Sequence, residues 1–294
     1  MHKSVVEKDW FLAGAVRVER QENESTSADE SGSEDASDTE TEPEDQSKPD
    51  SESVPPASSA EPTQAPTAGP VNTSGIPQRV TQGSNGLSVC IDAGHQQHGM
   101  SDQEPIGPGA SQTKAKLTTG TAGCVTGMAE YVVNLQVALK LEQALINRGY
   151  TVIMIRANND CPYSNMERAL VANDSGASCF IRIHCNSLDN SSVTGVLSYA
   201  PTAANPYMPQ DVIGQSQRFA QLINERLCAA TGAQNRGIID GDQMTGINWC
   251  KVPVALVEMG FMSNPDEDRK LCDDGYQNLL AEGMANGIDA FFGR

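Results

Sequence analysis

Two histidines and two glutamates stand beside strongly apolar segments, where polar side chains are least expected. His95 follows the run VCIDAG, His184 follows FIRI, Glu258 follows VPVALV, and Glu130 opens a long amphipathic segment. An imidazole in a buried strand needs a hydrogen-bonding partner, and a desolvated carboxylate is unfavourable without a neighbouring charge or metal. His184 and Glu258 are therefore the strongest indications of a functional site.

This set of side chains fits metal-assisted hydrolysis. Catalytic zinc takes three protein ligands, two histidines and a glutamate among the known sets, and leaves its fourth position for water. The metal lowers the pKa of that water to about 7 and polarises a substrate carbonyl. A second glutamate outside the ligand set can take the proton of the water and return it to a leaving amine. Because the HExxH motif is absent, the ligands have to come from distant segments.

Ordinary structural roles stay open for some of these residues when each is taken alone. A single histidine at the end of a strand, such as His95, is usually a hydrogen-bonded surface residue. Glu130 stands at a helix start, where the helix dipole by itself stabilises an acid. His98, three residues after His95, is expected to be a surface histidine of the following loop. The case for a site depends on the four residues lying together.

Alternating strand and helix patterns carry these residues. Continuous apolar runs predict buried strands, and polar residues recurring every three to four positions predict helices. Strands are expected at 87–94, 150–156, 177–187, 193–200 and 252–261, and helices at 129–149, 164–176, 211–231 and 274–294. This order predicts an α/β fold, a single domain over 87–294 with a mainly parallel twisted sheet and helices on both faces. Ligands of such sheets bind beyond the carboxyl ends of the strands, where His95, His184 and Glu258 stand.

Residues 1–86 differ in composition from the rest of the chain. They hold 17 Asp and Glu against 6 Lys and Arg, a net charge of −11 out of −18. An acidic stretch precedes one rich in Pro, Ala, Ser and Thr, so we expect a disordered tail or linker. Its charge disfavours nucleic acid as a partner. The apolar run WFLAGAV at 10–16 is too short for a membrane span and lacks a basic flank, so no span is expected and no signal peptide is assigned.

The eight cysteines contain no CxxC pair, which argues against a zinc ribbon or a thioredoxin-type motif. Cys90, Cys179 and Cys185 lie in apolar strand-like runs, where a free cysteine behaves as a small core residue.

Four segments together resemble the zinc-dependent N-acetylmuramoyl-L-alanine amidases. They are VCIDAGH, MAEYVVNLQVALKLEQALINRGYTVIMIR, SCFIRIHCNS and VPVALVEMGFMSNPDEDRKL, in the family's order, and the resemblance covers nearly all of residues 87–294. It implies hydrolysis of the amide between N-acetylmuramic acid and L-alanine in peptidoglycan. It also implies one Zn²⁺ per chain, bound by His95, Glu130 and His184, with Glu258 as the catalytic base and acid. This substrate in turn implies an extracellular location or one in the bacterial cell envelope.

Three further polar residues fall in these motifs. Asn134 completes the pattern E-x-x-x-N and Asn186 completes I-H-x-N; each is expected either to orient ligands or substrate, or to pack. Arg182 shares a strand face with His184 under two-residue alternation, and it meets either a substrate carboxylate or a structural salt-bridge partner. The segment 96–127 is longer than a minimal family member needs, and its Gly, Pro and Thr content predicts a loop at the mouth of the cleft.

Other functions compete with this interpretation. A zinc peptidase or deacetylase would use the same ligand set, and a catalytically silent protein with an amidase fold would bind peptidoglycan without cutting it. A pure binding protein has no need of a desolvated acid at Glu258, so this residue favours an enzyme. In a third alternative the acidic tail recruits a basic partner, which deletion of residues 1–86 would test.

Overall fold

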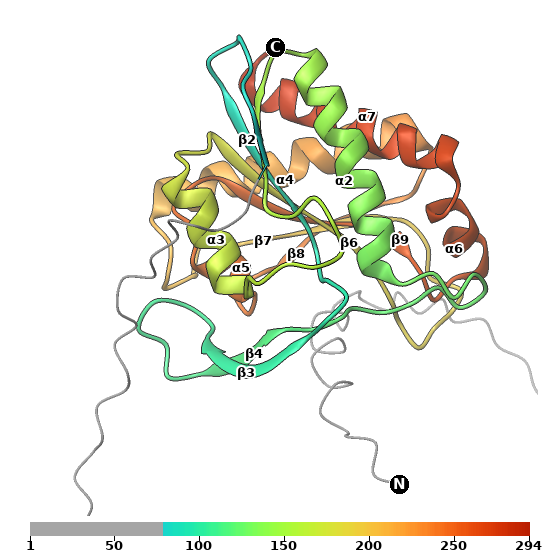
Figure 1. Cartoon of the computed structure of the whole chain (residues 1–294), viewed down its shortest axis with the longest axis horizontal. Helices are drawn as coiled ribbons and strands as arrows, with labels where there is room; N and C mark the ends of the chain where they lie inside the picture. The colour runs from blue at the N-terminus through green and yellow to red at the C-terminus, as the bar shows by residue number, and fades with distance from the viewer. Residues whose placement is uncertain (1–78) are drawn as a thin grey trace, which may run out of the picture.

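A computed structural model describes residues 79–294 of the chain. These residues form one seven-stranded sheet with helices on both faces and a separate two-stranded hairpin (Figure 1). The strands of the sheet lie in the order β1-β5-β2-β6-β9-β7-β8. Their bounds are β1 (Arg79–Thr81), β2 (Ser88–Ala93), β5 (Thr151–Met154), β6 (Cys179–Asn186), β7 (Val196–Ala200), β8 (Asn235–Asp240) and β9 (Val254–Phe261).

Parallel pairing dominates the sheet, so the predicted α/β fold is confirmed. The pairs β2–β5, β2–β6, β6–β9 and β7–β8 are parallel, while β1–β5 and β7–β9 are antiparallel. The sheet is therefore mixed, with a parallel centre that holds the strands predicted to carry the site. The two strands that the sequence did not indicate, β1 and β8, are at the edges, where one side lacks a partner and the apolar signal is weak.

Helices cover both faces of the sheet. Their bounds are α2 (Glu130–Asn147), α3 (Asn165–Asp174), α4 (Gln210–Thr231), α5 (Thr245–Asn248), α6 (Pro265–Leu271) and α7 (Asp274–Phe292). Figure 1 shows α2, α4 and α7 grouped on one side, where α7 contacts both α2 and α4. A second apolar cluster lies against α3 and α5. Two cores thus enclose the central strands, as their near-continuous apolar sequences predicted.

The central strands β6 and β9 are buried along their entire length. Their parallel register sets His184 directly beside Glu258. These two polar residues therefore stand side by side in the most enclosed part of the sheet, at the carboxyl ends of its central strands.

The long segment after His95 is more regular than predicted. Instead of a loop, it contains a hairpin of β3 (Met100–Pro105) and β4 (Thr113–Leu117), which lies apart from α2 and α7 in Figure 1. Two hydrogen bonds join the hairpin to the chain around α5. The indole nitrogen of Trp249 donates to the carbonyl of Pro105 at 3.0 Å, and the Lys114 ammonium donates to the carbonyl of Gln243 at 2.7 Å. Strand β3 (MSDQEP) does not alternate apolar and polar residues and β4 (TKAKL) is short and lysine-rich, so the hairpin lacks a strong strand signal in the sequence.

The described fold begins before residue 87, the predicted start of the domain. Strand β1 pairs with β5, and Arg79 donates from Nε to a carboxylate oxygen of Glu142 on α2 at 2.8 Å. Residues 79–86 therefore belong with the sheet, whereas the rest of the predicted disordered tail, residues 1–78, lies outside the described residues. Within residues 79–294 no helix is long and apolar enough to cross a membrane. All eight cysteines have free thiols.

Candidate active site

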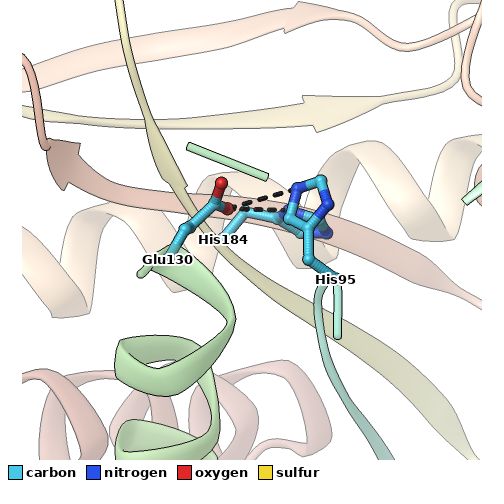
Figure 2. A group of neighbouring side chains, drawn as sticks. All are labelled: His95, Glu130 and His184. Atoms are coloured by element: carbon cyan, nitrogen blue, oxygen red, sulfur yellow. Dashed lines mark hydrogen bonds and ion pairs between the residues drawn. The ribbon is translucent and has the colours of Figure 1, made fainter. Parts of the chain in front are cut away.

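His95, Glu130 and His184 come together from three different elements. His95 follows β2, Glu130 is the first residue of α2, and His184 lies near the end of β6. One ligand atom from each residue can be chosen so that all three lie within 4.8 Å of one another, close enough to hold a metal ion. Figure 2 shows the Glu130 carboxylate turned toward both imidazoles. Its Oε1 is 3.4 Å from Nε2 of His95 and 3.3 Å from Nδ1 of His184.

The ring of His95 is held by the chain that leaves the hairpin. Its Nδ1 lies 2.9 Å from the carbonyl oxygen of Thr118 and 3.0 Å from the Thr118 hydroxyl. Because a carbonyl only accepts hydrogen bonds, Nδ1 carries a proton, and Nε2 is the ring nitrogen that faces Glu130. This arrangement of a backbone acceptor behind a histidine is typical of metal ligands, since it fixes the tautomer and the ring orientation.

Two glycines allow the chain to approach the site closely. A Cβ on Gly94 would lie 2.2 to 2.6 Å from atoms of the His184 ring. Gly120 has a φ of +79°, and a Cβ there would lie 2.5 Å from Oε2 of Glu130 and 2.9 Å from the ring of His95. The backbone at these positions therefore forms part of the wall around the three side chains.

Hydrogen bonds fix the Glu130 carboxylate on both sides. Oε2 accepts from the backbone N–H of Thr121 at 3.0 Å, and Oε1 accepts from the N–H of Cys185 at 3.1 Å and from the Asn134 amide at 3.2 Å. Burial alone would raise the pKa of Glu130, but His95 and His184 outweigh it and hold the pKa well below its usual range. The carboxylate is thus ionised and ready to bind a cation.

His184 is buried and neutral. Burial lowers its pKa to about 4, although Glu130 acts in the opposite direction. Its Nε2 has no hydrogen-bond partner in the described part of the chain. A neutral imidazole and an ionised carboxylate are the forms in which these side chains bind metals.

Glu258 lies beside this group without belonging to it. The residue is 8% exposed, and its Oε2 has no hydrogen-bond partner among the described residues. Burial and, after it, the nearby charge of Glu130 raise the pKa of Glu258 well above its ordinary value. This environment favours the protonated carboxyl group, whereas a cation beside it would favour the ionised carboxylate, which is here a stronger base than an exposed one.

The other residues considered in the sequence have defined surroundings. Asn134 links two segments of the site, because its amide donates both to Glu130 and to the carbonyl of Gly94 at 3.2 Å. Asn186 accepts from the N–H that follows it, at 2.7 Å. Arg182 points to Asp92, with Nε 2.9 Å from Oδ2, so it makes the structural salt bridge that was one of its two predicted roles. His98 is exposed and is not one of the clustered ligand residues.

Sequence reasoning missed the backbone that supports the site. Thr118 and Thr121 contact the site residues mainly through main-chain groups, which leave no signature in residue type. Gly120 could have been singled out only as a glycine in a Gly-rich loop.

The donor set fits a divalent metal such as zinc. Two imidazoles and one carboxylate are a known set for catalytic zinc, which keeps one further position open. The orphaned Nε2 of His184 and Oε2 of Glu258 are buried polar atoms that a bound cation and its water would satisfy. The arrangement is thus suited to metal-assisted hydrolysis, with a buried carboxyl group beside three side chains that could hold a metal.

Comparison with known proteins agrees with this chemistry. The family described as N-acetylmuramoyl-L-alanine amidase matches residues 89–290. The N-acetylmuramoyl-L-alanine amidase LytC of Bacillus subtilis is 29% identical over 210 residues, which are 70% of this chain and 36% of LytC. A sporulation-specific N-acetylmuramoyl-L-alanine amidase of the same organism is 28% identical over 70% of this chain and 68% of its own length.

Solved structures of amidases share the fold. The N-acetylmuramyl-L-alanine amidase Ami1 from Mycobacterium smegmatis superposes with a TM-score of 0.63 and 26% identity, covering 71% of this chain and 97% of its own. An N-acetylmuramoyl-L-alanine amidase from Clostridium difficile 630 gives a TM-score of 0.58 and 25% identity, covering 71% and 98%. The family match extends over more than half of the chain and includes all four site residues. The chain therefore belongs to the N-acetylmuramoyl-L-alanine amidase family.

Proposed function

We propose that this protein is a zinc-dependent peptidoglycan hydrolase. It cleaves the amide between N-acetylmuramic acid and the L-alanine of the stem peptide, and the products are a lactyl carboxylate and a free L-alanine amine. The observation that carries the proposal is the cluster of His95, Glu130 and His184 with the buried Glu258 carboxylate beside it. Family membership supplies the class of amide.

Each of these side chains has a distinct role in the proposed reaction. His95, Glu130 and His184 bind one Zn²⁺. When bound, zinc makes a water molecule acidic and polarises the carbonyl of the amide. Glu258 accepts the proton of the attacking water and then gives it to the nitrogen of the leaving L-alanine. Asn134 keeps the Glu130 carboxylate in place through its amide hydrogen bond.

The remaining residues are assigned by the same proposal. Residues 79–294 are the catalytic domain, and residues 1–78 are an acidic spacer that leaves this domain free to reach its substrate. Because peptidoglycan lies outside the cytoplasmic membrane, the protein acts in the bacterial cell envelope or outside the cell. The names of its relatives, which include cell wall amidases, support this location.

Release of free N-terminal L-alanine from purified muropeptides tests the proposal. The full chain is assayed with zinc, with a chelator, and as the Glu258→Ala variant. We expect new amines only from the wild-type protein with zinc. Binding of one zinc without cleavage of several muropeptides would favour a silent binding protein, whereas failure of a folded sample to bind zinc would contradict the metal site itself.

A further inference from the structure

Arg156 follows strand β5 and is 2% exposed. Its guanidinium donates four hydrogen bonds, and every acceptor is a backbone carbonyl. Nε reaches Ala93 O at 2.7 Å, Nη1 reaches Asn158 O at 3.0 Å, and Nη2 reaches both Gly94 O at 3.0 Å and Tyr131 O at 2.7 Å. Arg156 thus contacts three separate segments of backbone.

Two of these segments carry proposed metal ligands. Ala93 and Gly94 immediately precede His95, and Tyr131 immediately follows Glu130 in the first turn of α2. A single nitrogen of Arg156, Nη2, donates to both segments. The guanidinium therefore fixes the distance between the backbone of the first ligand and the backbone of the second.

The turn at His95 needs such support. His95 is the one residue other than glycine with a positive φ in the described part of the chain, at 57°. Left-handed backbone is unfavourable for side chains with a Cβ, and it persists where the surrounding contacts determine it. The planar fork of arginine suits this task, because its donors have fixed relative directions.

The absence of a carboxylate partner separates Arg156 from its buried neighbours. Arg168 and Arg182 both pair with Asp92, at 2.6 Å and 2.9 Å. Among residues 79–294 no such pair joins Arg156, and burial lowers its pKa to about 10. A buried cation without a directly bound carboxylate is unfavourable for stability, so packing alone is a poor explanation for an arginine here.

We propose that Arg156 is a positioning residue that holds the His95 turn and the start of α2 at the separation that metal binding requires. This inference rests on the proposed function, since it concerns the same metal site. Arg156 does not touch the metal or the substrate; it acts through the backbone of the segments that carry His95 and Glu130.

Zinc affinity of the metal-free full-length protein, measured by competition with a chromophoric chelator, tests this role. The variants are Arg156→Lys, which keeps the charge but not the fork, and Arg182→Lys as a matched control. Arg182 is equally buried, but its hydrogen bonds go to the side chains of Asp92 and Asn165 and not to backbone carbonyls of the ligand-bearing segments. Removing support behind metal ligands typically costs about 10- to 100-fold in affinity. We expect that loss for Arg156→Lys and a zinc Kd close to wild type for Arg182→Lys.

The same variants separate positioning from a general structural role. At zinc concentrations that fill the site, Arg156→Lys should lower kcat for muropeptides with little change in KM, because Arg156 is covered from substrate. Equal zinc Kd values for wild type and Arg156→Lys, or equal losses in both lysine variants, would overturn the inference. If Arg156→Lys does not fold, Arg156→Gln replaces it, since it removes the unpaired charge and keeps one amide donor. A folded wild-type protein that binds no zinc would instead refute the proposed function.

Discussion

Two buried polar clusters lie next to each other at the carboxyl ends of β2 and β6, and they differ in how their atoms are used. In the first, which we call the salt-bridge cluster, one carboxylate oxygen of Asp92 accepts a hydrogen bond from Arg168 and the other accepts one from Arg182. In the second, which we call the ligand cluster, His95, Glu130 and His184 lie together. Within residues 79–294 the Nε2 of His184 has no hydrogen-bond partner, and neither does the Oε2 of the adjacent Glu258.

The titration of the two clusters follows this difference. Burial alone would raise the pKa of Asp92, but Arg168 and Arg182 outweigh it and hold the pKa far below its usual range. Beside the ligand cluster, burial and a like charge raise the pKa of Glu258. The salt-bridge cluster supplies its own counter-charges, whereas the ligand cluster has the donor atoms for the cation that we propose.

Equal burial therefore accompanies opposite roles. In the salt-bridge cluster every charge has a partner, so the cluster contributes to stability. Removing one member would leave the remaining buried charges without a partner and would destabilise the fold. Beside the ligand cluster, buried polar atoms lack partners among the described residues and the pKa of Glu258 is raised. Such features are typical of sites that bind a ligand or catalyse a reaction. Variants in the two clusters should accordingly separate activity from stability.

The largest effect is expected at Glu258. Glu258→Gln removes the proton acceptor but keeps the size of the side chain, so kcat should fall by about 10²- to 10⁴-fold. Zinc affinity should persist, because the three ligands are unchanged. The free energy of unfolding should not decrease, because the neutral glutamine amide matches the size of the protonated carboxyl group that burial favours. Amine release, zinc titration and denaturant unfolding check these points. Retention of wild-type kcat would assign the acid–base role to another group.

A comparable change, but in stability, is expected in the salt-bridge cluster. Asp92→Ala leaves two buried guanidinium groups without a counter-charge, and the loss of one partner from a buried ion pair costs about 3–5 kcal/mol. Urea unfolding of the metal-free protein measures it, with Glu258→Gln as the control that should show no such loss. Equal stability of Asp92→Ala and wild type would mean that the two clusters do not differ as argued.

Zinc should stabilise only an intact ligand cluster. At a free zinc concentration of about 100 times Kd, binding to the folded state adds about 2.7 kcal/mol to the free energy of unfolding. His184→Ala should abolish this shift in thermal unfolding, and Glu258→Gln should keep it, since Glu258 is outside the ligand set. The same zinc-induced shift in His184→Ala would place the bound metal elsewhere on the protein.

The sequence predicted the central architecture because buried parallel strands have a strong signal. Strands β6 and β9 appear as largely apolar runs, and the polar residues within them include His184 and Glu258, which we propose for the site. The side chains of the ligand cluster were therefore accessible from sequence. The salt-bridge partner of Arg182 could not be predicted from the sequence. Two-residue alternation predicts which face of the strand a side chain lies on, but it does not predict that Arg182 pairs with Asp92.

Other parts of the molecule have no comparable signal. The β3–β4 hairpin is held by contacts such as that from Trp249 to the carbonyl of Pro105, which depend on distant backbone. The support of His95 comes likewise from the carbonyl of Thr118, and any residue type offers a carbonyl. The hairpin and the orientation of His95 thus depend on tertiary hydrogen bonds to main-chain groups, which sequence patterns do not predict.

The smallest effect concerns Glu104 on β3, which tests whether one orphaned atom is sufficient to indicate a site. Glu104 is 2% exposed, its Oε1 accepts from the N–H of Met166 at 3.0 Å, and its Oε2 has no partner among the described residues. It belongs to no group of metal-binding side chains in residues 79–294. If the clustering of open atoms is what matters, Glu104→Gln should leave zinc affinity and kcat unchanged.

The effect of Glu104→Gln should instead appear in the free energy of unfolding, and it should depend on pH. Burial raises the pKa of Glu104 from 4.5 to about 6, so between these values the folded state binds more protons than the unfolded state. Stability from this group therefore falls as pH rises from about 4.5 through 6, and the loss is complete above that range. Glu104→Gln should be more stable than wild type near pH 7.5, by no more than about 1 kcal/mol because solvent and hydrogen bonds reduce the effect. Urea unfolding at a series of pH values should show this advantage shrinking toward pH 4. An advantage that does not change with pH would trace the effect to packing, and a loss of zinc affinity would extend the open cluster to the hairpin.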